Sequence, residues 1–235
     1  AGSTPKNIYQ QLVSGETVAR LVTFPEGFSS HQIIERLNKT QALKGSITID
    51  TPEGSLLPDT YHFTLDDSKN SIIKHMKDRM QSVSKKLWQE REDNLPFDTL
   101  QEAIILASIV EKETSIAKER GLVASVFINR LRKNMLLQTD PTVIYAMTKG
   151  KEKLDRPLLR KDLKIDSPFN TYKYKGLPPA PICNPGIESI KAVLNPDKSD
   201  YLYFVATGDG GHYFAKTLRQ HNKNVRKYRK TLRGG

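Results

Sequence analysis

The sequence has little cysteine, no long apolar run and a shortage of acidic residues. Its single cysteine, Cys183, excludes an intrachain disulfide. No cluster of histidines or further cysteines accompanies Cys183 in its proline-rich stretch, so nothing marks it as a metal ligand or a nucleophile. No apolar run approaches the roughly 18 residues that a membrane-spanning helix needs. A chain with so few thiols is compatible with both the cytosol and the periplasm.

Acidic residues are outnumbered by basic ones, 26 to 37, which leaves a net charge of +11. Such an excess suits an acidic partner, namely a nucleic acid, an anionic lipid or a polymer that carries carboxylates, although it can also serve solubility alone. Much of the excess lies near the C-terminus, where five residues recur at helical spacing: Leu218, His221, Val225, Tyr228 and Leu232. A docked helix with a solvated basic face explains this pattern better than a nucleic-acid arm, and no aromatic–basic interleaving is present.

The length of 235 residues and the 37% hydrophobic content are those of a globular protein with a real core. The predicted fold class is α+β: a mainly helical domain around a buried central helix, with a small antiparallel sheet. We expect strands over 19–24, 201–206 and 212–214, and irregular loops over 52–63 and 167–186. We expect helices over the following ranges: 4–13, 29–37, 68–91, 98–114, 122–132, from 140 onward, 187–194 and 218–232.

The stretch 98–114 is the predicted centre of the fold. Asp98 or Thr99 can cap its N-terminus, and between Ala103 and Val110 only Ser108 is polar. A helix that is apolar nearly all round belongs inside the fold.

Two acids, Glu111 and Glu113, end this apolar run, and they lie about 200° apart around the helix. We favour Glu111 as a working acid, because the small residues Ala107 and Ser108 beneath it leave room for a ligand, and because desolvation would raise its pKa. Glu113 is then expected to be a structural partner for a Lys or Arg. The alternative, that both are solvated helix-end carboxylates, has equal weight on the pattern alone.

Further candidates come from polar side chains in loops or beside apolar stripes. Three consecutive hydrogen-bonding side chains precede or begin a predicted helix: Gln138, Thr139 and Asp140. A plain N-cap explains Thr139 and Asp140 but not Gln138. Asn129 lies beside the apolar stripe of the preceding helix. Tyr61 lies in the loop 52–63, where a packed loop tyrosine is an equally good interpretation. The loop 167–186 is long and rich in proline and tyrosine, which is more typical of a functional loop than of an idle one.

Five stretches, in the same order, together resemble the YceG-like family, and the Pro-Asp-Thr-Tyr stretch at 58–61 fits too. They are ASIVEKET at 107–114, VFINRL at 126–131, LQTDPTVIY at 137–145, NTY…GLPP at 170–179 and YLYFVA…GGH at 201–212. The resemblance runs from about Val22 to the end. It implies that residues 21–235 are a YceG-like catalytic domain, and that residues 1–20 are the remnant of an N-terminal LysM-like subdomain. It further implies that most of that subdomain, and a membrane anchor, lie outside this sequence.

The resemblance implies a bacterial enzyme that cuts the β-1,4 bond between MurNAc and GlcNAc of peptidoglycan and leaves 1,6-anhydro-MurNAc ends, so terminating or trimming nascent glycan strands. It implies Glu111 as the catalytic residue, with no metal and no cofactor. The expected location is the bacterial inner membrane with the catalytic domain facing the periplasm. The expected partners are peptidoglycan glycan strands and cell-wall synthases, and not nucleic acid. The candidates for holding the sugars are Tyr61, Asn129, Gln138, Thr139, Asp140 and Tyr172.

Three alternatives to this interpretation stay open on the sequence. A hydrolase would use water and a second carboxylate, for which Asp140 is the candidate. A non-catalytic domain would bind glycan or nucleic acid through its basic charge. A scaffold for cell-wall synthesis is compatible with the enzyme, since an anchored enzyme can also recruit synthases.

Overall fold

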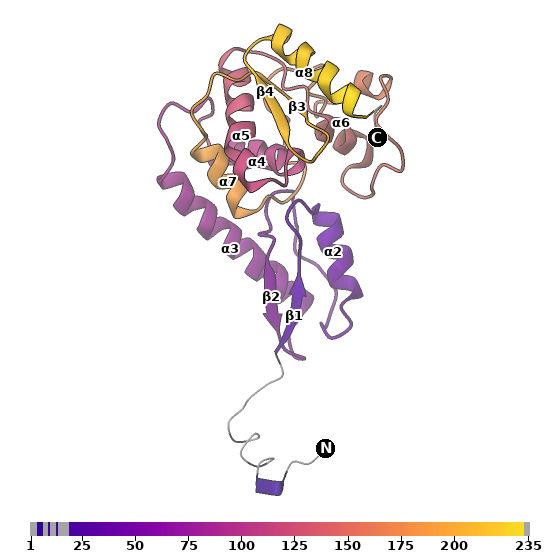
Figure 1. The fold of residues 1–235 in the computed structure, drawn as a ribbon. Coiled ribbons are helices and arrows are strands. Elements are labelled where there is room, and N and C mark those ends of the chain that lie inside the picture. The colour runs from indigo at the N-terminus through magenta and orange to yellow at the C-terminus, as the bar shows by residue number, and fades with distance from the viewer. Residues whose placement is uncertain (1–3, 7–8, 10–12, 14–18, 233–235) are drawn as a thin grey trace.

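The computed structural model describes residues 4–6, 9, 13 and 19–232. The helix predicted over 4–13 and the subdomain remnant predicted over 1–20 lie largely outside these ranges, so both stay predictions. Within the described ranges the chain forms seven α-helices and two antiparallel sheets of two strands each, which confirms the predicted α+β class (Figure 1).

The lower part in Figure 1 is built around a small sheet that the N-terminal segment forms. Strand β1 (Arg20–Thr23) pairs antiparallel with β2 (Thr60–Phe63), with Val22 opposite Tyr61. Helix α2 (Ser30–Lys39) and the first half of α3 (Lys69–Gln89) pack beside it. Their buried side chains form what we call the N-terminal core, which includes Phe24, Ile33, Leu37, Leu56, Tyr61, Ile73 and Met76.

Strand β2 is a correction to the sequence analysis, which treated the whole of 52–63 as a loop. Its four residues alternate between exposed and buried, with Tyr61 and Phe63 facing the core. That alternation is the period of a half-buried strand. A strand of four residues is too short to be distinguished from a loop by its sequence pattern, and its pairing with β1 is what identifies it.

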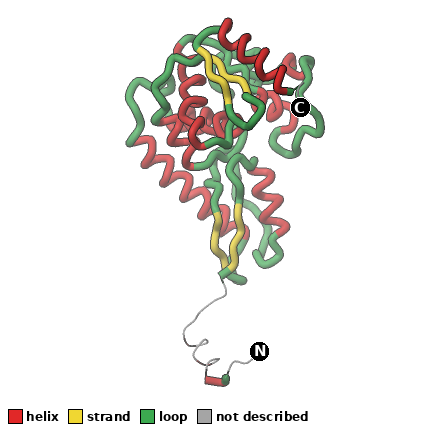
Figure 2. The backbone as a smooth tube through the Cα atoms, in the orientation of Figure 1, coloured by secondary structure: helices red, strands yellow, loops and turns green. Residues whose placement is uncertain are grey.

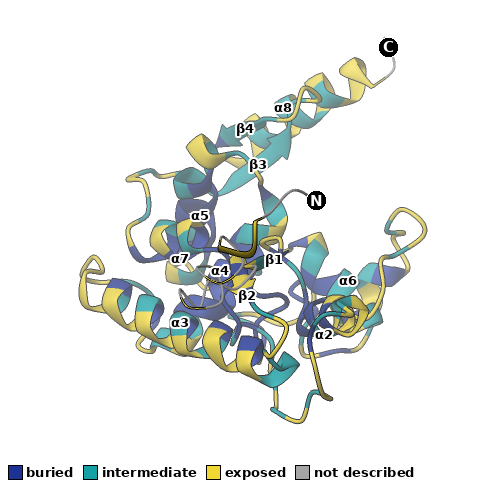
Figure 3. Cartoon of the chain, turned by 90° about the horizontal axis from the view of Figure 1, so that it is seen from below, coloured by how far each residue is buried: buried dark blue, intermediate teal, exposed yellow. Residues whose placement is uncertain are grey.

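The upper part is organised around α4 (Leu100–Glu113), as predicted. Thr99 caps the helix in a capping box with Glu102, and every residue from Ala103 to Val110 is buried (Figure 3). Helices α5 (Ala117–Arg132) and α7 (Ile187–Leu194) pack directly on α4, together with α6 (Asp140–Thr148) and the far half of α3. We call this cluster the central core.

Helix α5 begins at Ala117 rather than at the predicted Leu122. Its first turns carry Glu119 and Arg120, which look like turn residues in the sequence. Both are drawn inward instead: Glu119 accepts a hydrogen bond from the backbone of His212, and Arg120 is buried. Long-range contacts therefore extend the helix beyond its apolar stripe.

A hairpin and the last helix cover the opposite side of α5. Strand β3 (Tyr203–Ala206) pairs with β4 (His212–Ala215), and α8 (Leu218–Thr231) lies along them (Figure 1). Thr217 caps α8, and the basic residues of the helix face solvent, as predicted. The predicted docked face is only partly covered, because no residue of α8 is buried and Leu218 and Leu232 are exposed. No helix in the described part of the chain is both long and apolar enough to cross a bilayer.

The two cores are joined by the irregular stretch between α6 and α7, whose only helical element is the short 3₁₀ turn Asp162–Lys164 (Figure 2). Asn184, at its end, is fully buried. Its Oδ1 accepts from the backbone N–H of Leu56 at 2.9 Å, and its Nδ2 donates to the carbonyl of Phe28 at 3.1 Å. One side chain thus satisfies buried backbone groups that belong to the other core.

We therefore expect Asn184→Ala to destabilise the protein by roughly 2–4 kcal/mol, because it leaves the Leu56 N–H buried without a partner. Urea unfolding followed by circular dichroism measures the loss. The matched control is Asn222→Ala, at an exposed position on α8, which should change the free energy of unfolding by less than about 0.5 kcal/mol. Equal stabilities of the two variants would contradict this account of the joint.

Candidate active site

The C-terminal end of α4 extends beyond the central core and carries two acids, Glu111 and Glu113, on different sides of the helix. Glu111 faces the end of the loop 167–186, where its Oε2 accepts from the backbone N–H of Gly186 at 2.9 Å. Glu113, the last residue of α4, faces the start of α6 and accepts a hydrogen bond from the hydroxyl of Thr139. The two acids therefore do not share a pocket, as their spacing predicts.

The pKa of the Glu113 carboxyl is shifted by its surroundings. The pKa is raised to about 7, and burial is the largest cause. The nearby charge of Asp140 also raises it, while the Thr139 hydrogen bond and the charges of His212 and Arg130 lower it. The C-terminal end of a helix also carries partial negative charge, which disfavours a carboxylate there. Near neutral pH this side chain can both hold and release a proton.

A cavity of 460 Å³ opens in front of Glu113. Its polar lining consists of side chains from several elements: Glu113, Arg130, Gln138, Asp140, Tyr172, Tyr203 and His221. Its apolar lining comes mainly from β3 and from Phe127. The volume lies within the usual range for small-molecule sites, and the mixture of an acid, an amide and hydroxyls suits sugar hydroxyls.

The segment before α6 is held in place by the loop 167–186. The backbone N–H groups of Gln138 and Thr139 donate to the carbonyl and the hydroxyl of Thr171, both at 3.1 Å. Gln138 adopts a left-handed conformation with φ of 50°. Thr139 occupies the N-cap position of α6, yet its side chain bonds to Glu113 instead of capping the helix. The simple capping interpretation of Thr139 is therefore wrong.

Tyr172 and Asp140 form a pair at the edge of the same cavity. The phenol of Tyr172 donates to Asp140 Oδ1 at 2.5 Å. Burial and the Asp140 carboxylate together raise the pKa of Tyr172, so the phenol keeps its proton at neutral pH. Four predicted site residues, Gln138, Thr139, Asp140 and Tyr172, are thus brought together around Glu113.

Arg130 is a residue whose role the sequence analysis missed. Its guanidinium is buried and donates to the carbonyls of Leu137 and Leu202, each at 2.7 Å. It ties β3 and the segment before α6 to α5 and supplies a positive charge near Glu113. The signal in the sequence is an arginine inside an apolar helical stripe, which usually has a buried partner.

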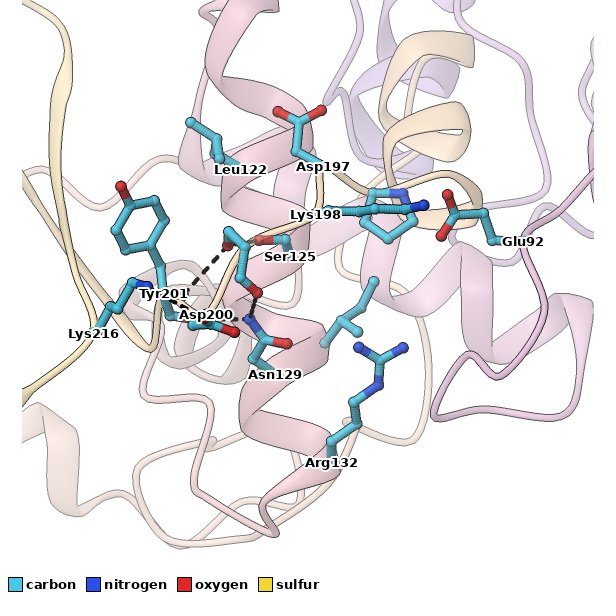
Figure 4. A pocket seen from close by; sticks show the side chains of 13 residues that line it. Glu92, Leu122, Ser125, Asn129, Arg132, Asp197, Lys198, Asp200, Tyr201 and Lys216 are labelled. Carbon is cyan, nitrogen blue, oxygen red and sulfur yellow. Dashed lines mark hydrogen bonds and ion pairs between the residues drawn. The ribbon is translucent and has the colours of Figure 1, made fainter.

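Two predicted sugar-binding residues lie elsewhere. Tyr61 is 1% exposed in the N-terminal core, where its hydroxyl donates to the Leu57 carbonyl at 2.8 Å. Asn129 donates to the carbonyls of Ser199 and Tyr201 beside a separate pocket of 660 Å³ (Figure 4). Neither lines the cavity of Glu113, and each side chain donates to backbone carbonyls away from that cavity.

The surroundings of the two acids differ from those expected, and the catalytic role expected of Glu111 stays a prediction. Glu111 is half-buried beside Gly27 and is engaged with the Gly186 backbone, while the neighbouring Lys112 donates to the carbonyl of Gly27 at 3.3 Å. Glu113 has a threonine hydroxyl where a Lys or Arg partner was expected. Glu111 was favoured because an acid that is desolvated and faces free space can act as a proton donor. In the structure, Glu113 is the acid with these two properties. In the described part of the chain no three His, Cys, Asp or Glu residues are arranged to hold a metal ion.

Comparison with known proteins places these features in a family context. A family model described as the YceG-like family matches residues 1–227. An endolytic murein transglycosylase of Bacillus subtilis (strain 168) is 46% identical over 177 residues, which are 75% of this chain and 48% of that protein. A protein of the same name from Streptococcus pneumoniae serotype 2 is 36% identical over 74% of this chain and 31% of its own length. The matched region thus spans half or less of these relatives.

A solved structure shares the fold. A protein described as yceG-like from Listeria monocytogenes superposes with a TM-score of 0.70 at 35% identity, covering 93% of this chain and 80% of that chain. The match extends over both the N-terminal and the central core.

The raised pKa of Glu113 predicts how stability depends on pH. A carboxyl whose pKa rises from 4.5 to about 7 on folding contributes stability that is complete below about pH 4.5 and is lost as the pH rises through 7. Glu113→Gln removes that loss, so its stability relative to the parent protein should increase by roughly 1–3 kcal/mol between about pH 5 and pH 8. Urea unfolding at both pH values measures this difference.

Glu53, whose pKa burial also raises to about 7, is present in both proteins and cancels from the comparison. Glu90→Gln, at an exposed position, is the control and should show no such trend. A difference for Glu113→Gln that does not change with pH would mean that the carboxyl is not desolvated.

Proposed function

The chain belongs to the YceG-like family, and on that premise we propose that it is the catalytic part of an endolytic peptidoglycan lytic transglycosylase. It cleaves the MurNAc-β-1,4-GlcNAc bond, leaves 1,6-anhydro-MurNAc ends and so terminates or trims nascent glycan strands. The names of the relatives support the substrate and the reaction class. The observation that carries the proposal is the protonatable Glu113 at a cavity lined by hydrogen-bonding side chains.

A single acid is sufficient for this reaction. Glu113 donates its proton to the bridging oxygen as the bond from that oxygen to C1 of MurNAc breaks. The C6 hydroxyl of the same MurNAc then attacks C1, and the Glu113 carboxylate takes the hydroxyl proton. One C–O bond is broken and one is formed, no water is consumed, and Glu113 ends in its starting state. The second carboxylate of ordinary glycosidases is not needed, because the substrate supplies the nucleophile.

The neighbours of Glu113 have separate tasks in this scheme. The Thr139 hydroxyl holds the carboxyl in one orientation, and the buried Arg130 stabilises the carboxylate that forms after proton transfer. Gln138 and the Tyr172–Asp140 pair offer an amide, a phenol and a carboxylate at the cavity wall for sugar hydroxyls. Effects of this kind each contribute to the rate by orienting groups before the reaction.

The hydrolase alternative has one specific observation in its favour, the position of Asp140. It lines the same cavity as Glu113 and is close enough for its charge to raise the Glu113 pKa. A water activated by Asp140 would give products with ordinary reducing ends, whereas the proposed reaction gives ends that are lighter by one water. Mass spectrometry of the products therefore separates the two reactions.

The cellular setting belongs to the same proposal. Peptidoglycan lies outside the inner membrane, so the catalytic domain is expected to face the periplasm and to be held there by an anchor beyond this sequence. The net charge of +11 suits a substrate with carboxylate-bearing stem peptides. Cell-wall synthases are the expected protein partners, and pull-down of the full-length protein from membranes tests this.

Glu113→Gln should lower kcat on peptidoglycan strands by at least about 100-fold, because the amide cannot transfer the proton. Glu111→Gln should retain activity within about tenfold, since Glu111 bonds to the Gly186 backbone outside the cavity. Appearance of 1,6-anhydro products, followed by mass spectrometry, measures both. The opposite ranking of the two variants would return the catalytic role to Glu111.

The activity of the parent protein should fall as the pH rises through about 7, because Glu113 must carry the proton that it donates. Measuring kcat between about pH 5 and pH 9 at constant ionic strength gives the profile. A profile that stays flat up to pH 9 would exclude Glu113 as the general acid.

A further inference from the structure

A second cavity, of 490 Å³, lies next to the one that holds Glu113. It is bounded by the start of α2, by one face of α6 and by the segment 150–158 that follows α6. Apart from Asp140, none of the predicted site residues lines it. Nothing in the proposed reaction yet uses this space.

The two cavities share a wall. Asp140 lines both of them, with its Oδ1 bonded to Tyr172 of the first cavity. The consecutive residues Lys112 and Glu113 at the end of α4 line the second and the first cavity respectively. Pro141, next to Asp140, lines the second cavity alone. Both cavities therefore meet where the end of α4 approaches the start of α6, beside the proposed proton donor.

The lining of the second cavity is apolar on one side and carries charges of both signs on the other. The apolar side comes from α6 and the following segment, with Ile144, Leu154 and the ring of Tyr145. The cations without a carboxylate partner in the part of the chain that the structure describes are Lys112 and Lys153, since Arg156 is already paired with Asp162 through bonds of 2.6 and 3.0 Å. The carboxylates are those of Asp140, which is bonded to Tyr172, and of Glu152. Lys153 is exposed and makes no ion pair with any described residue. Such a site suits a group with an apolar face and a carboxylate.

We propose that the second cavity is a further subsite beside the cavity of Glu113, and that it receives the neighbouring sugar unit of the strand together with a carboxylate of its stem peptide. This inference rests on the proposed function, since it takes the glycan strand as the ligand. With one unit in each cavity, the strand passes over the Asp140 wall, and the scissile bond lies beside Glu113. Binding on both sides of that bond matches cutting within a strand rather than at its end.

The experiment measures strand binding in a Glu113→Gln background, so that the ligand stays intact. The ligands are peptide-bearing glycan strands and the same strands freed of peptides by an amidase. Lys153→Glu should weaken binding of the peptide-bearing strands by roughly three- to tenfold, because it reverses the charge facing the stem carboxylates. It should weaken binding of the peptide-free strands by less, because the amidase leaves only the lactyl carboxylate on each MurNAc. The matched control is Lys198→Glu, an exposed lysine at the separate 660 Å³ pocket, which should affect neither ligand.

A second variant tests the space rather than the charge. Ile144→Trp enlarges a half-buried side chain of the cavity wall and should weaken both ligands by about tenfold or more while thermal melting shows that the fold is kept. The subsite proposal would be overturned if Lys153→Glu and Lys198→Glu changed the affinity for peptide-bearing strands equally. It would also be overturned if Ile144→Trp bound both ligands as tightly as the parent protein. If the parent protein fails to form 1,6-anhydro products but the binding pattern is found, the reaction is wrong and the subsite stands.

Discussion

The proposed site depends on the partial removal of the Glu113 side chain from water at the end of a buried helix. An isolated carboxylate in such a place is costly, and the protein meets that cost by raising its pKa to about 7 and by offering it one hydroxyl, that of Thr139. A Lys or Arg in direct contact would have fixed the charged form and removed the proton. Arg130 is placed differently, because its guanidinium donates to three backbone carbonyls, those of Leu136, Leu137 and Leu202. Its charge is therefore felt by Glu113 without forming an ion pair with it.

The irregular loop 167–186 is what makes this arrangement possible. Thr171 holds the segment before α6, and Tyr172 reaches Asp140. Further along, the backbone N–H of Ile182 donates to the hydroxyl of Ser108, the one polar residue in the apolar run of α4. Asn184 then reaches the N-terminal core, and Gly186 meets Glu111. One segment without regular structure thus fixes the cavity, the central helix and the joint between the two cores.

Patterns with a local cause could be predicted from the sequence, and features set by distant partners could not. The central helix, its capping box and the C-terminal hairpin follow from spacing and capping residues that lie within a few positions of one another. The choice between Glu111 and Glu113 depends on which loop covers each side of α4, and those loops come from residues far along the chain. The same holds for Tyr61 and Asn129, whose hydrogen-bonding groups are used up by backbone partners that no local pattern reveals. The resemblance to the YceG-like family gave the family correctly, but it assigned the catalytic role to Glu111, whereas the surroundings of the two acids lead us to propose Glu113.

The single cysteine has a consequence for following the protein in solution. Cys183 is 1% exposed, its thiol contacts the carbonyl of Ser108, and burial raises its pKa well above the ordinary value. It therefore has little thiolate and no access to reagents while the segment beside it stays closed. Because Asn184 is the next residue, any labelling of this thiol by a maleimide or a disulfide reagent reports the opening of the joint between the two cores. The rate at which Cys183 is labelled thus measures local unfolding at that position, without an engineered probe.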